Sequence, residues 1–357
     1  MALELEVNGV VYDNALNIRA SRSLHNLCGY FEVNSSIDPD NLLPVKAGDA
    51  IRVLADGVSV MNGYIETLEV GYDDTSHSIY IFGRDRTGDM FDSTVSGSKS
   101  FSAPASFLSI VRSVLDAGNM AHIGIVNQAI DAPDFAAGET IEAEVGQTIF
   151  GFLEPYARKL QIVMTTNGDG DVLLLRAGNT SSGLRLARGE NIKSASFKKK
   201  TTDIFYKYTS RAQLDPLGFD DAPAGEVVNQ TGETAVDTSA RKSRVLEFNV
   251  EEDMDNSTSF NRAQFEANIR RANAVNYSCV VQGHSLNGKP FSINTLAYVD
   301  DSFCGIASDM LIHSVEYSYT LNSGSTTKLQ MTYKDAFTLN AQQEAREAAR
   351  QSVGDDF

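Results

Sequence analysis

One stretch of alternating apolar and polar residues constrains the fold of this chain more than any other. Tyr64–Val70 and Ser78–Phe82 each alternate with a period of two, which is typical of strands with one buried face. Asp73–His77 between them is rich in turn-forming residues and contains no proline. The sequence therefore predicts a long β-hairpin that ends at Gly83–Gly88 and leads into a short segment, Asp89–Val95.

A weaker copy of this pattern lies near the other end of the chain. Leu311–Tyr317 has the same pattern, and a turn at Asn322–Ser325 separates it from a further strand. Three identities recur at a constant separation of 247 positions (312 − 65, 316 − 69 and 277 − 30): Ile65 and Ile312, Glu69 and Glu316, and Tyr30 and Tyr277. The shared order of strand, loop, strand and long hairpin predicts two related β modules.

Shorter strand patterns surround the first hairpin within residues 1–98. Strands are predicted at Leu3–Tyr12, Leu16–Ser23, Gly29–Val33, Ile51–Ala55 and Val58–Met61. The last two flank Asp-Gly, the strongest short hairpin signal in the sequence. So many short strands in under about a hundred residues suit a barrel or a sandwich, and the first module is predicted to be all-β.

Residues 99–183 have a different character. Apolar residues from Phe107 to Leu115 fall at helical spacing before a stop at Gly118-Asn119. A second helix is predicted after Thr148, with Pro155 expected to kink or interrupt it. Leu160–Thr165 and Val172–Leu175 then predict a hairpin, so this segment is expected to be a small α+β domain inserted between the β modules.

The rest of the chain is expected to alternate between connecting and β regions. Residues 184–276 form a connecting α+β region with strands at Ile192–Phe197, Ile204–Thr209 and Val245–Val250 and a helix from Phe260 to about Ala274. Within it, Ala212–Ser243 has no sustained period and is predicted to be a long irregular loop. Residues 277–340 form the second β module, and residues 341–357 a polar tail.

The composition limits the classes of function. A formal net charge of −17 argues against a protein that grips nucleic acid, because neutralising phosphates requires a basic surface. An acidic surface along which nucleic acid slides and simple solubility are both compatible with this charge. No apolar run approaches the roughly 20 residues of a membrane helix. The N-terminus has no signal region, and the cysteines suggest no disulfide framework, so we expect folding in a cytoplasm.

Candidate metal sites each lack a required element. Asn167–Asp171 is similar to the start of a calcium loop, but position six is Val172 in place of glycine and position twelve is Gly178 in place of glutamate. A glycine-rich hairpin turn is the expected structure. A zinc site could be assembled only from scattered residues, without a CxxC or HxxxH pair. These residues are His25, Cys28, Cys279, His284, Cys304 and His313.

Catalytic motifs are also missing from the sequence. It contains no GxSxG motif, no phosphate-binding loop and no histidine arranged with a nucleophile. A carboxylate pair of the glycosidase kind stays open in so acidic a chain. We expect no enzymatic activity, no cofactor and no metal.

Several segments together resemble the baseplate hub protein of Mu-like contractile-tailed phages, the tail hub or late control protein D-like family. Their order and spacing carry the resemblance, which covers most of the chain and is weakest in the loop Ala212–Ser243 and the C-terminal tail. The segments are Gly29–Glu32, Gly63–Ile65, Gly83–Asp92, Thr148–Thr166, Arg188–Ile192 and the helix before Tyr277.

The resemblance implies a fold and an assembly. The expected fold class is mainly β with α+β: two tube-like β-barrel modules plus an inserted small α+β domain. Three chains would form a homotrimeric ring of six similar barrels that joins the sixfold tail tube to the threefold central spike. DNA would pass through its channel without specific binding. The protein would lie in the virion tail baseplate, after assembly with other baseplate components in the host cytoplasm.

Several charged residues are candidates for contacts within such an assembly. Glu66, Glu69, Asp73 and Asp74 lie on the polar face or the turn of the long hairpin and are predicted to face the channel or the tube end. Arg84, Asp85 and Arg86 either form local ion pairs at the hairpin end or contact another subunit. Lys198-Lys199-Lys200 is either a solvated strand end or a contact with a negatively charged partner.

Two other functions compete with this interpretation. One is the head of a genome-free contractile injection system spike. The other is a carbohydrate-binding or carbohydrate-active tail protein.

Overall fold

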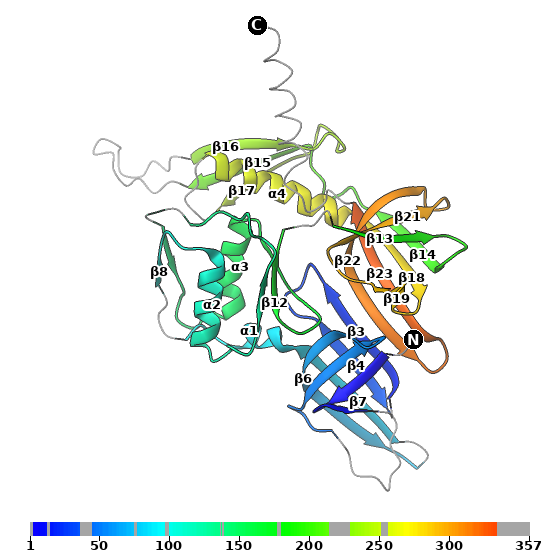
Figure 1. Cartoon of the computed structure of the whole chain (residues 1–357). Coiled ribbons are helices and arrows are strands. Elements are labelled where there is room, and N and C mark those ends of the chain that lie inside the picture. The colour runs from blue at the N-terminus through cyan, green and yellow to red at the C-terminus, as the bar shows by residue number, and fades with distance from the viewer. Residues whose placement is uncertain are drawn as a thin grey trace, which may run out of the picture. The chain divides into compact units, whose positions relative to one another are not determined.

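The computed structural model describes residues 3–12, 15–35, 45–74, 77–96, 100–135, 137, 139–176, 180–213, 229–250 and 256–333. These residues are mainly in strands with a smaller helical content, which confirms the predicted fold class (Figure 1). The chain divides into two compact units. The first comprises Met1–Ser196 and Tyr277–Met331, and the second comprises Phe197–Asn276 and Thr332–Phe357.

The predicted long hairpin is the centre of the first half of the main sheet. It consists of β6, Val58–Tyr72, a strand of 15 residues, and β7, His77–Asp85. β7 pairs with β4, Tyr30–Ser35, which pairs in turn with β3, Ala15–Ser23. On the other side β6 pairs with β5, Ala50–Ala55, which pairs with β1. β1 and the short β2 span Leu3–Val7 and Val10–Val11.

The second half of the sheet repeats this arrangement. Its hairpin consists of β22, Ile306–Thr320, and β23, Gly324–Tyr333. β23 pairs with β18, Val275–Gln282, and β22 pairs with β21, Thr295–Asp301. The sheet is extended by β14, Ile192–Lys199, beside β18, and by β13, Ser181–Ala187, parallel to β21. The short strands β19, Ser285–Leu286, and β20, Lys289–Pro290, pair separately.

The repeat extends to the register of strand pairing. Tyr30 lies opposite Arg84 between β4 and β7, and Tyr277 lies opposite Met331 between β18 and β23. Both members of the second pair follow their counterparts by 247 positions (277 − 30 and 331 − 84). A register offset by one residue would reverse the face of every side chain, so agreement at both members supports the prediction of two related β modules.

One strand of the first half joins the two halves. β3 pairs with β4 on one edge and with β22 on the other, in an antiparallel ladder from Ser23↔Ser314 to Asn17↔Thr320. The two halves therefore form one continuous 13-stranded sheet, and no closed barrel occurs among the described residues. The predicted closure within each module fails for a physical reason. The edge of β3 that could close the first barrel is used by the second half.

The predicted α+β domain is inserted after the first half. Helix α2, Phe107–Ala117, begins at the Ser106 cap and ends at Gly118. The predicted hairpin is formed by β11, Val163–Thr166, and β12, Val172–Leu175, with β9, Ile125–Asn127, parallel to β12. The strands β8, Ser100–Ser102, and β10, Thr140–Glu142, form a separate pair.

Helix α3, Ile149–Lys159, continues through Pro155, so the expected interruption is wrong. Proline cannot donate to the carbonyl four residues earlier, which is that of Gly151. The side-chain amide of Gln147 donates to this carbonyl instead, over 3.2 Å. A capping bond from the Gly151 amide to the Thr148 hydroxyl fixes the start of the helix.

The second unit contains a three-stranded sheet and a helix. The central strand β15, Lys207–Gln213, pairs with β16, Asn229–Val236, and with β17, Val245–Val250. Helix α4, Asn256–Ala274, packs on this sheet through Ala263 and Ala267 against Tyr208. β16 lies inside the segment predicted to be irregular. Its polar sequence lacks the apolar alternation that marks a strand, and backbone pairing with β15 makes it one.

No helix in the described part of the chain is long and apolar enough to cross a membrane. The polar tail, residues 341–357, lies outside the described residues, as does much of the predicted irregular loop.

The backbone is closely packed around Gly83 at the base of the long hairpin, and a substitution there tests this packing. A Cβ atom at Gly83 would lie 2.0 Å from the Tyr64 carbonyl oxygen and 2.5 Å from a ring carbon of Phe31. Gly83→Ala is expected to lower the free energy of unfolding by about 2–3 kcal/mol, because backbone and a buried ring would have to shift. Gly71→Ala in the same hairpin is the control, since its nearest neighbour is the Ser78 hydroxyl at 3.3 Å. Urea unfolding measures both, and equal losses would contradict this packing.

Candidate assembly interface

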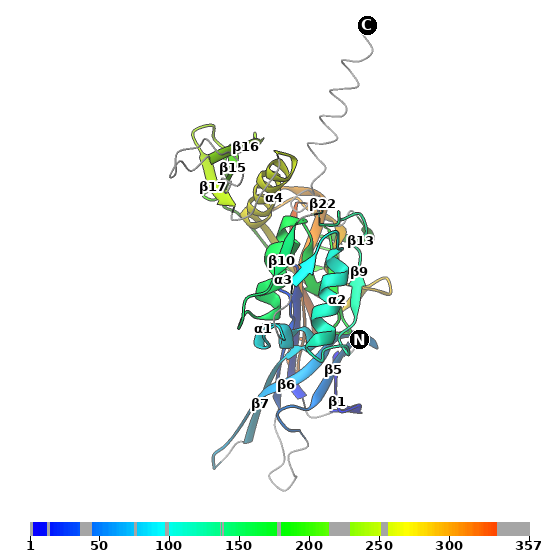
Figure 2. The ribbon, with the colours of Figure 1, turned by 90° about the vertical axis from the view of Figure 1, so that its left-hand side faces the viewer.

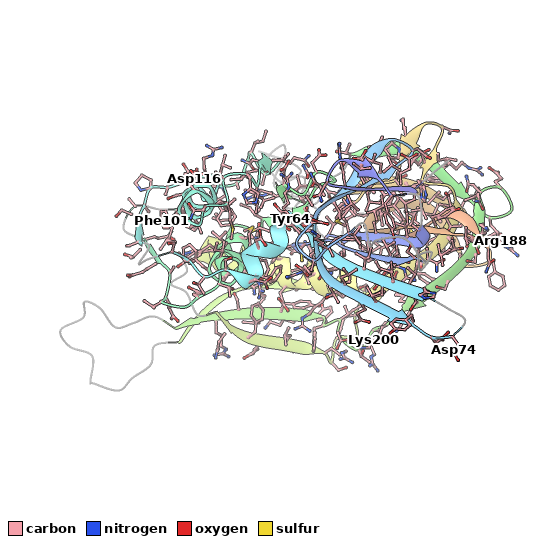
Figure 3. All side chains as sticks on the ribbon, turned by 90° about the horizontal axis from the view of Figure 1, so that it is seen from below. Tyr64, Asp74, Phe101, Asp116, Arg188 and Lys200 are labelled. Carbon is pink, nitrogen blue, oxygen red and sulfur yellow. The ribbon has the colours of Figure 1, made fainter. Side chains whose placement is uncertain are left out.

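The distal half of the β6–β7 hairpin is largely exposed on its β6 side. Glu69, Asp73 and Asp74 are all exposed there, as are two large apolar side chains, Val70 at 59% and Tyr72 at 83%. Figure 3 shows Asp74 at the tip of the hairpin, far from Tyr64 at its base. The hairpin extends well beyond β5 (Figure 2). This end of the hairpin therefore presents acidic and apolar groups to solvent.

Glu66 differs from the other three acidic residues, because it is part of an ion-pair cluster at the base of the hairpin. The Arg84 guanidinium donates to both Glu66 carboxylate oxygens, at 2.8 and 2.9 Å. It also pairs with Asp92 in α1, the short helix Asp89–Asp92. The hydrogen bonds that Arg84 donates to Glu66 and Asp92 raise its pKa. The cluster ties the hairpin to the start of the inserted domain.

Asp85 is buried, with 2% of its surface exposed, and holds three backbone segments together. Its carboxylate accepts bonds from the Gly29 amide, at 2.6 Å, and from the Thr87 amide, at 3.0 Å. Thr87 belongs to the 3₁₀ turn η1, Arg86–Gly88, and Thr166 of β11 also bonds to Asp85. Burial raises the pKa of Asp85 to about 6 despite these bonds.

Arg86 connects the hairpin to the inserted domain. Its guanidinium donates to the His122 carbonyl at 3.1 Å and to the Asp169 carbonyl, and it lies 3.4 Å from Asp171. The Ser59 hydroxyl of β6 donates to the Gly168 carbonyl at 2.7 Å. A Cβ atom at Gly168 would lie 2.2 Å from the Ser59 carbonyl oxygen, so glycine allows this turn to dock on the strand.

These contacts account for the charged triplet at the end of the hairpin. Arg84, Asp85 and Arg86 all have partners within the chain: the two arginines form ion pairs, and Asp85 accepts backbone amides. Asn167–Asp171 is a turn between β11 and β12, and within the described residues no group of three His, Cys, Asp or Glu side chains is placed to hold a metal. The three cysteines are free thiols.

No local pattern in the sequence predicted the junction between the halves. Arg19 of β3 lies 3.7 Å from Glu316 of β22 and 3.5 Å from Glu32 of β4, so charge pairs cross both of its ladders. The His25 and His313 rings meet edge to face with their centroids 5.0 Å apart, and burial lowers the pKa of both. Pairing between strands about 300 residues apart leaves no local pattern, although the repeat itself predicts two similar halves.

Known protein families match both halves of this duplicated sheet. Residues 2–85, which contain β1–β7, match the model of the Mu phage baseplate assembly protein GpP-like N-terminal domain. Residues 255–340 match the model of the fourth domain of Mu phage baseplate assembly protein GpP. Both ends of the chain therefore match domains of Mu phage baseplate assembly proteins. The resemblance inferred from the sequence is confirmed.

Similar proteins cover almost the whole chain. The baseplate hub protein gp44 of Escherichia phage Mu is 23% identical over 340 residues, which are 93% of this chain and 88% of that protein. The 43 kDa tail protein of the Shewanella oneidensis prophage MuSo2 has a TM-score of 0.80 at 23% identity and covers 94% of this chain and 99% of its own.

A component of a secretion system has a similar fold. A component of the Escherichia coli type VI secretion system has a TM-score of 0.56 at 9% identity, covering 93% of this chain and 78% of its own. The chain therefore has a fold shared by phage tail proteins and by a type VI secretion component.

Asp85 should make stability depend on pH in a particular direction. Its pKa in the folded protein, about 6, is above the value of about 4 for an exposed aspartate, so the folded state holds the proton more tightly. Proton binding by Asp85 therefore stabilises the folded state. This contribution to the free energy of unfolding is complete below about pH 4 and is lost as the pH rises through about 6. The difference in unfolding free energy between the wild type and Asp85→Asn should fall by about 2–3 kcal/mol from about pH 4 to 7. Urea titrations at each pH measure it, with Asp74→Asn as the exposed control; a difference that rises with pH would contradict the prediction.

Arg86 should contribute more to stability than a neighbouring arginine aimed at the same turn. Arg86→Met removes partly buried charged bonds and should lower the free energy of unfolding by about 2 kcal/mol. Arg52 lies 3.9 Å from Asp169, and both side chains are largely exposed, so Arg52→Met should cost less than about 0.5 kcal/mol. Thermal unfolding compares the two variants. Similar losses would mean that Arg86 does not anchor the inserted domain.

Proposed function

We propose that this protein is the structural hub of a contractile-tail baseplate. Three copies form a ring that joins the sixfold tail tube to the threefold central spike and encloses the DNA channel. The shared register of the two halves carries this proposal, since it gives each chain two equivalent β modules. Three chains then present six similar modules, which matches a sixfold partner on one side while the ring itself keeps threefold symmetry.

The exposed chemistry of the hairpin fits this role. Glu69, Asp73 and Asp74 are proposed to face the channel or the end of the tail tube, where their charge repels DNA phosphates and keeps the genome from adhering. Glu66 lies at the base of the same strand and balances Arg84. The Arg84–Asp85–Arg86 triplet is proposed to hold the hairpin rigid from inside the subunit.

The remaining assignments follow from this role. The hub acts as a non-enzymatic protein of the virion tail baseplate, with the tail tube, the central spike and other baseplate components as its partners, and it assembles in the host cytoplasm. The likeness to a type VI secretion component supports a second candidate, the spike head of a contractile injection system without a genome. Capsid genes beside the gene of this chain would favour the phage hub, and their absence the injection system.

The ring makes a direct prediction. The purified chain should have a mass of three 38.8 kDa subunits by multi-angle light scattering and should show threefold rings in negative-stain micrographs. Duplex DNA added at low salt should not change its sedimentation, because the chain carries a net charge of −17. A monomer at all concentrations, or a trimer without a central hole, would contradict the hub. Binding or cleavage of a glycan would favour the carbohydrate-directed alternative.

A further inference from the structure

The distal half of β6 has one unpaired edge. β5 pairs with β6 only as far as Tyr64, and the Ile65 amide bonds to the Asp49 carbonyl just beyond it. From Glu66 to Tyr72, β6 pairs with β7 on one edge and with no described strand on the other. An exposed edge with unpaired amides and carbonyls and large apolar side chains is a template for another strand.

The main sheet has a second free edge at its other end. β14 is the last strand beyond β18, and the residues from Lys193 to Lys199 are all exposed. The Lys193 ammonium bonds to the Gln282 side chain at one end, and the Lys200 amide donates to the Ala274 carbonyl at the other. Residue numbers rise along one strand as they fall along the other, so the pairing is antiparallel. Continued in register from the Lys200–Ala274 backbone bond, this ladder puts Ser196 opposite Ser278 (200 + 274 = 196 + 278).

The repeat shows how these two edges fit. β22 is the counterpart of β6, and the half of β22 that corresponds to the free edge is covered by β3. β14 is the counterpart of β3, because each lies beside the first strand of its half, β18 or β4. The geometry points to a second copy of this chain as the occupant: the free edge of β6 pairs with β14 of the neighbouring subunit, as β22 pairs with β3 within the chain.

The internal ladder also gives the register. Ala20 of β3 lies opposite both Phe31 of β4 and Tyr317 of β22. Val70 is the counterpart of Tyr317 by the separation of 247 (317 − 70), and Ser278 is that of Phe31 (278 − 31). Since Ser196 lies beside Ser278, it takes the place of Ala20. Val70 of one subunit therefore lies opposite Ser196 of the next.

The charges on the two edges are complementary. β14 contains Lys193, Lys198 and Lys199, whereas the β6 edge and its turn contain acidic residues. Glu316 pairs with Arg19 across the internal junction, but Glu69, its counterpart, forms no ion pair with any described residue. In the inferred register Glu69 is diagonal to Lys199 of the neighbour, within reach of a long side chain. A head-to-tail contact of this kind uses two different surfaces of each copy and closes into a ring when its rotation permits.

Cysteine crosslinking tests the register in the full chain. This inference rests on the proposed ring, so the oligomeric state and the extent of crosslinking are measured on the same sample. Val70→Cys with Ser196→Cys should form intersubunit disulfides under mild oxidation. Val70→Cys with Ser194→Cys should form several-fold fewer, because it is displaced along the strand by about 7 Å. Each single variant controls for the native free thiols. Trimers that crosslink equally in both pairs, or in neither, overturn the strand pairing and leave the hub intact; a chain with no oligomer overturns both.

Charge exchange tests the same contact without cysteines. Glu69→Lys or Lys199→Glu alone should weaken self-association about ten-fold at low salt, and the double exchange should restore it to within about three-fold, because opposite charges again face each other. Glu142→Lys, an exposed strand position in the inserted domain, is the control for net charge and should leave association unchanged. Sedimentation velocity over a dilution series measures each variant. Failure of the double exchange to restore association would overturn the contact.

Discussion

The pairing of β3 with β22 is the interaction on which the arrangement of the main sheet depends. It is a ladder between strands about 300 residues apart, and it makes the two halves one sheet instead of two separate barrels. Such a ladder satisfies the backbone groups of an edge that would otherwise attract another chain. The charge pairs of Arg19 to Glu32 and Glu316 lie along it. The second half therefore covers the edge of β3 that the first half leaves open.

The long hairpin needs a rigid base because half of β6 lies beyond its neighbour β5. Three consecutive residues provide that base in different ways. Arg84 neutralises Glu66 on the strand and Asp92 on the helix that follows, while Arg86 reaches the turn of the inserted domain. Asp85 between them is buried and accepts backbone amides from two loops. A substitution at this triplet therefore acts on the hairpin and the inserted domain together.

The sequence predicted those parts of the fold whose signals are local. The alternation in Tyr64–Val70 located the hairpin, and the apolar spacing from Phe107 to Leu115 with the stop at Gly118 located a helix. It failed where distant partners decide the outcome. β16 is a strand because β15 pairs with it, and Pro155 stays in a helix because the Gln147 amide compensates for its missing donor. The buried role of Asp85 had no local signal, since its partners Gly29 and Thr166 are distant in sequence.

The duplication imposes a constraint on any assembly of this chain. Two halves with the same strand register have equivalent edges. Within a single chain, however, only one of the two equivalent contacts forms. β3 pairs with the edge of β22, whereas no described strand pairs with the matching edge of β6. Among the described residues, the sheet of a monomer therefore leaves free both the distal edge of β6 and the outer edge of β14. Pairing these edges between copies satisfies both at once and repeats a contact that the chain already makes. If the rotation between successive modules is a sixth of a turn, three chains complete the circle and leave no edge open.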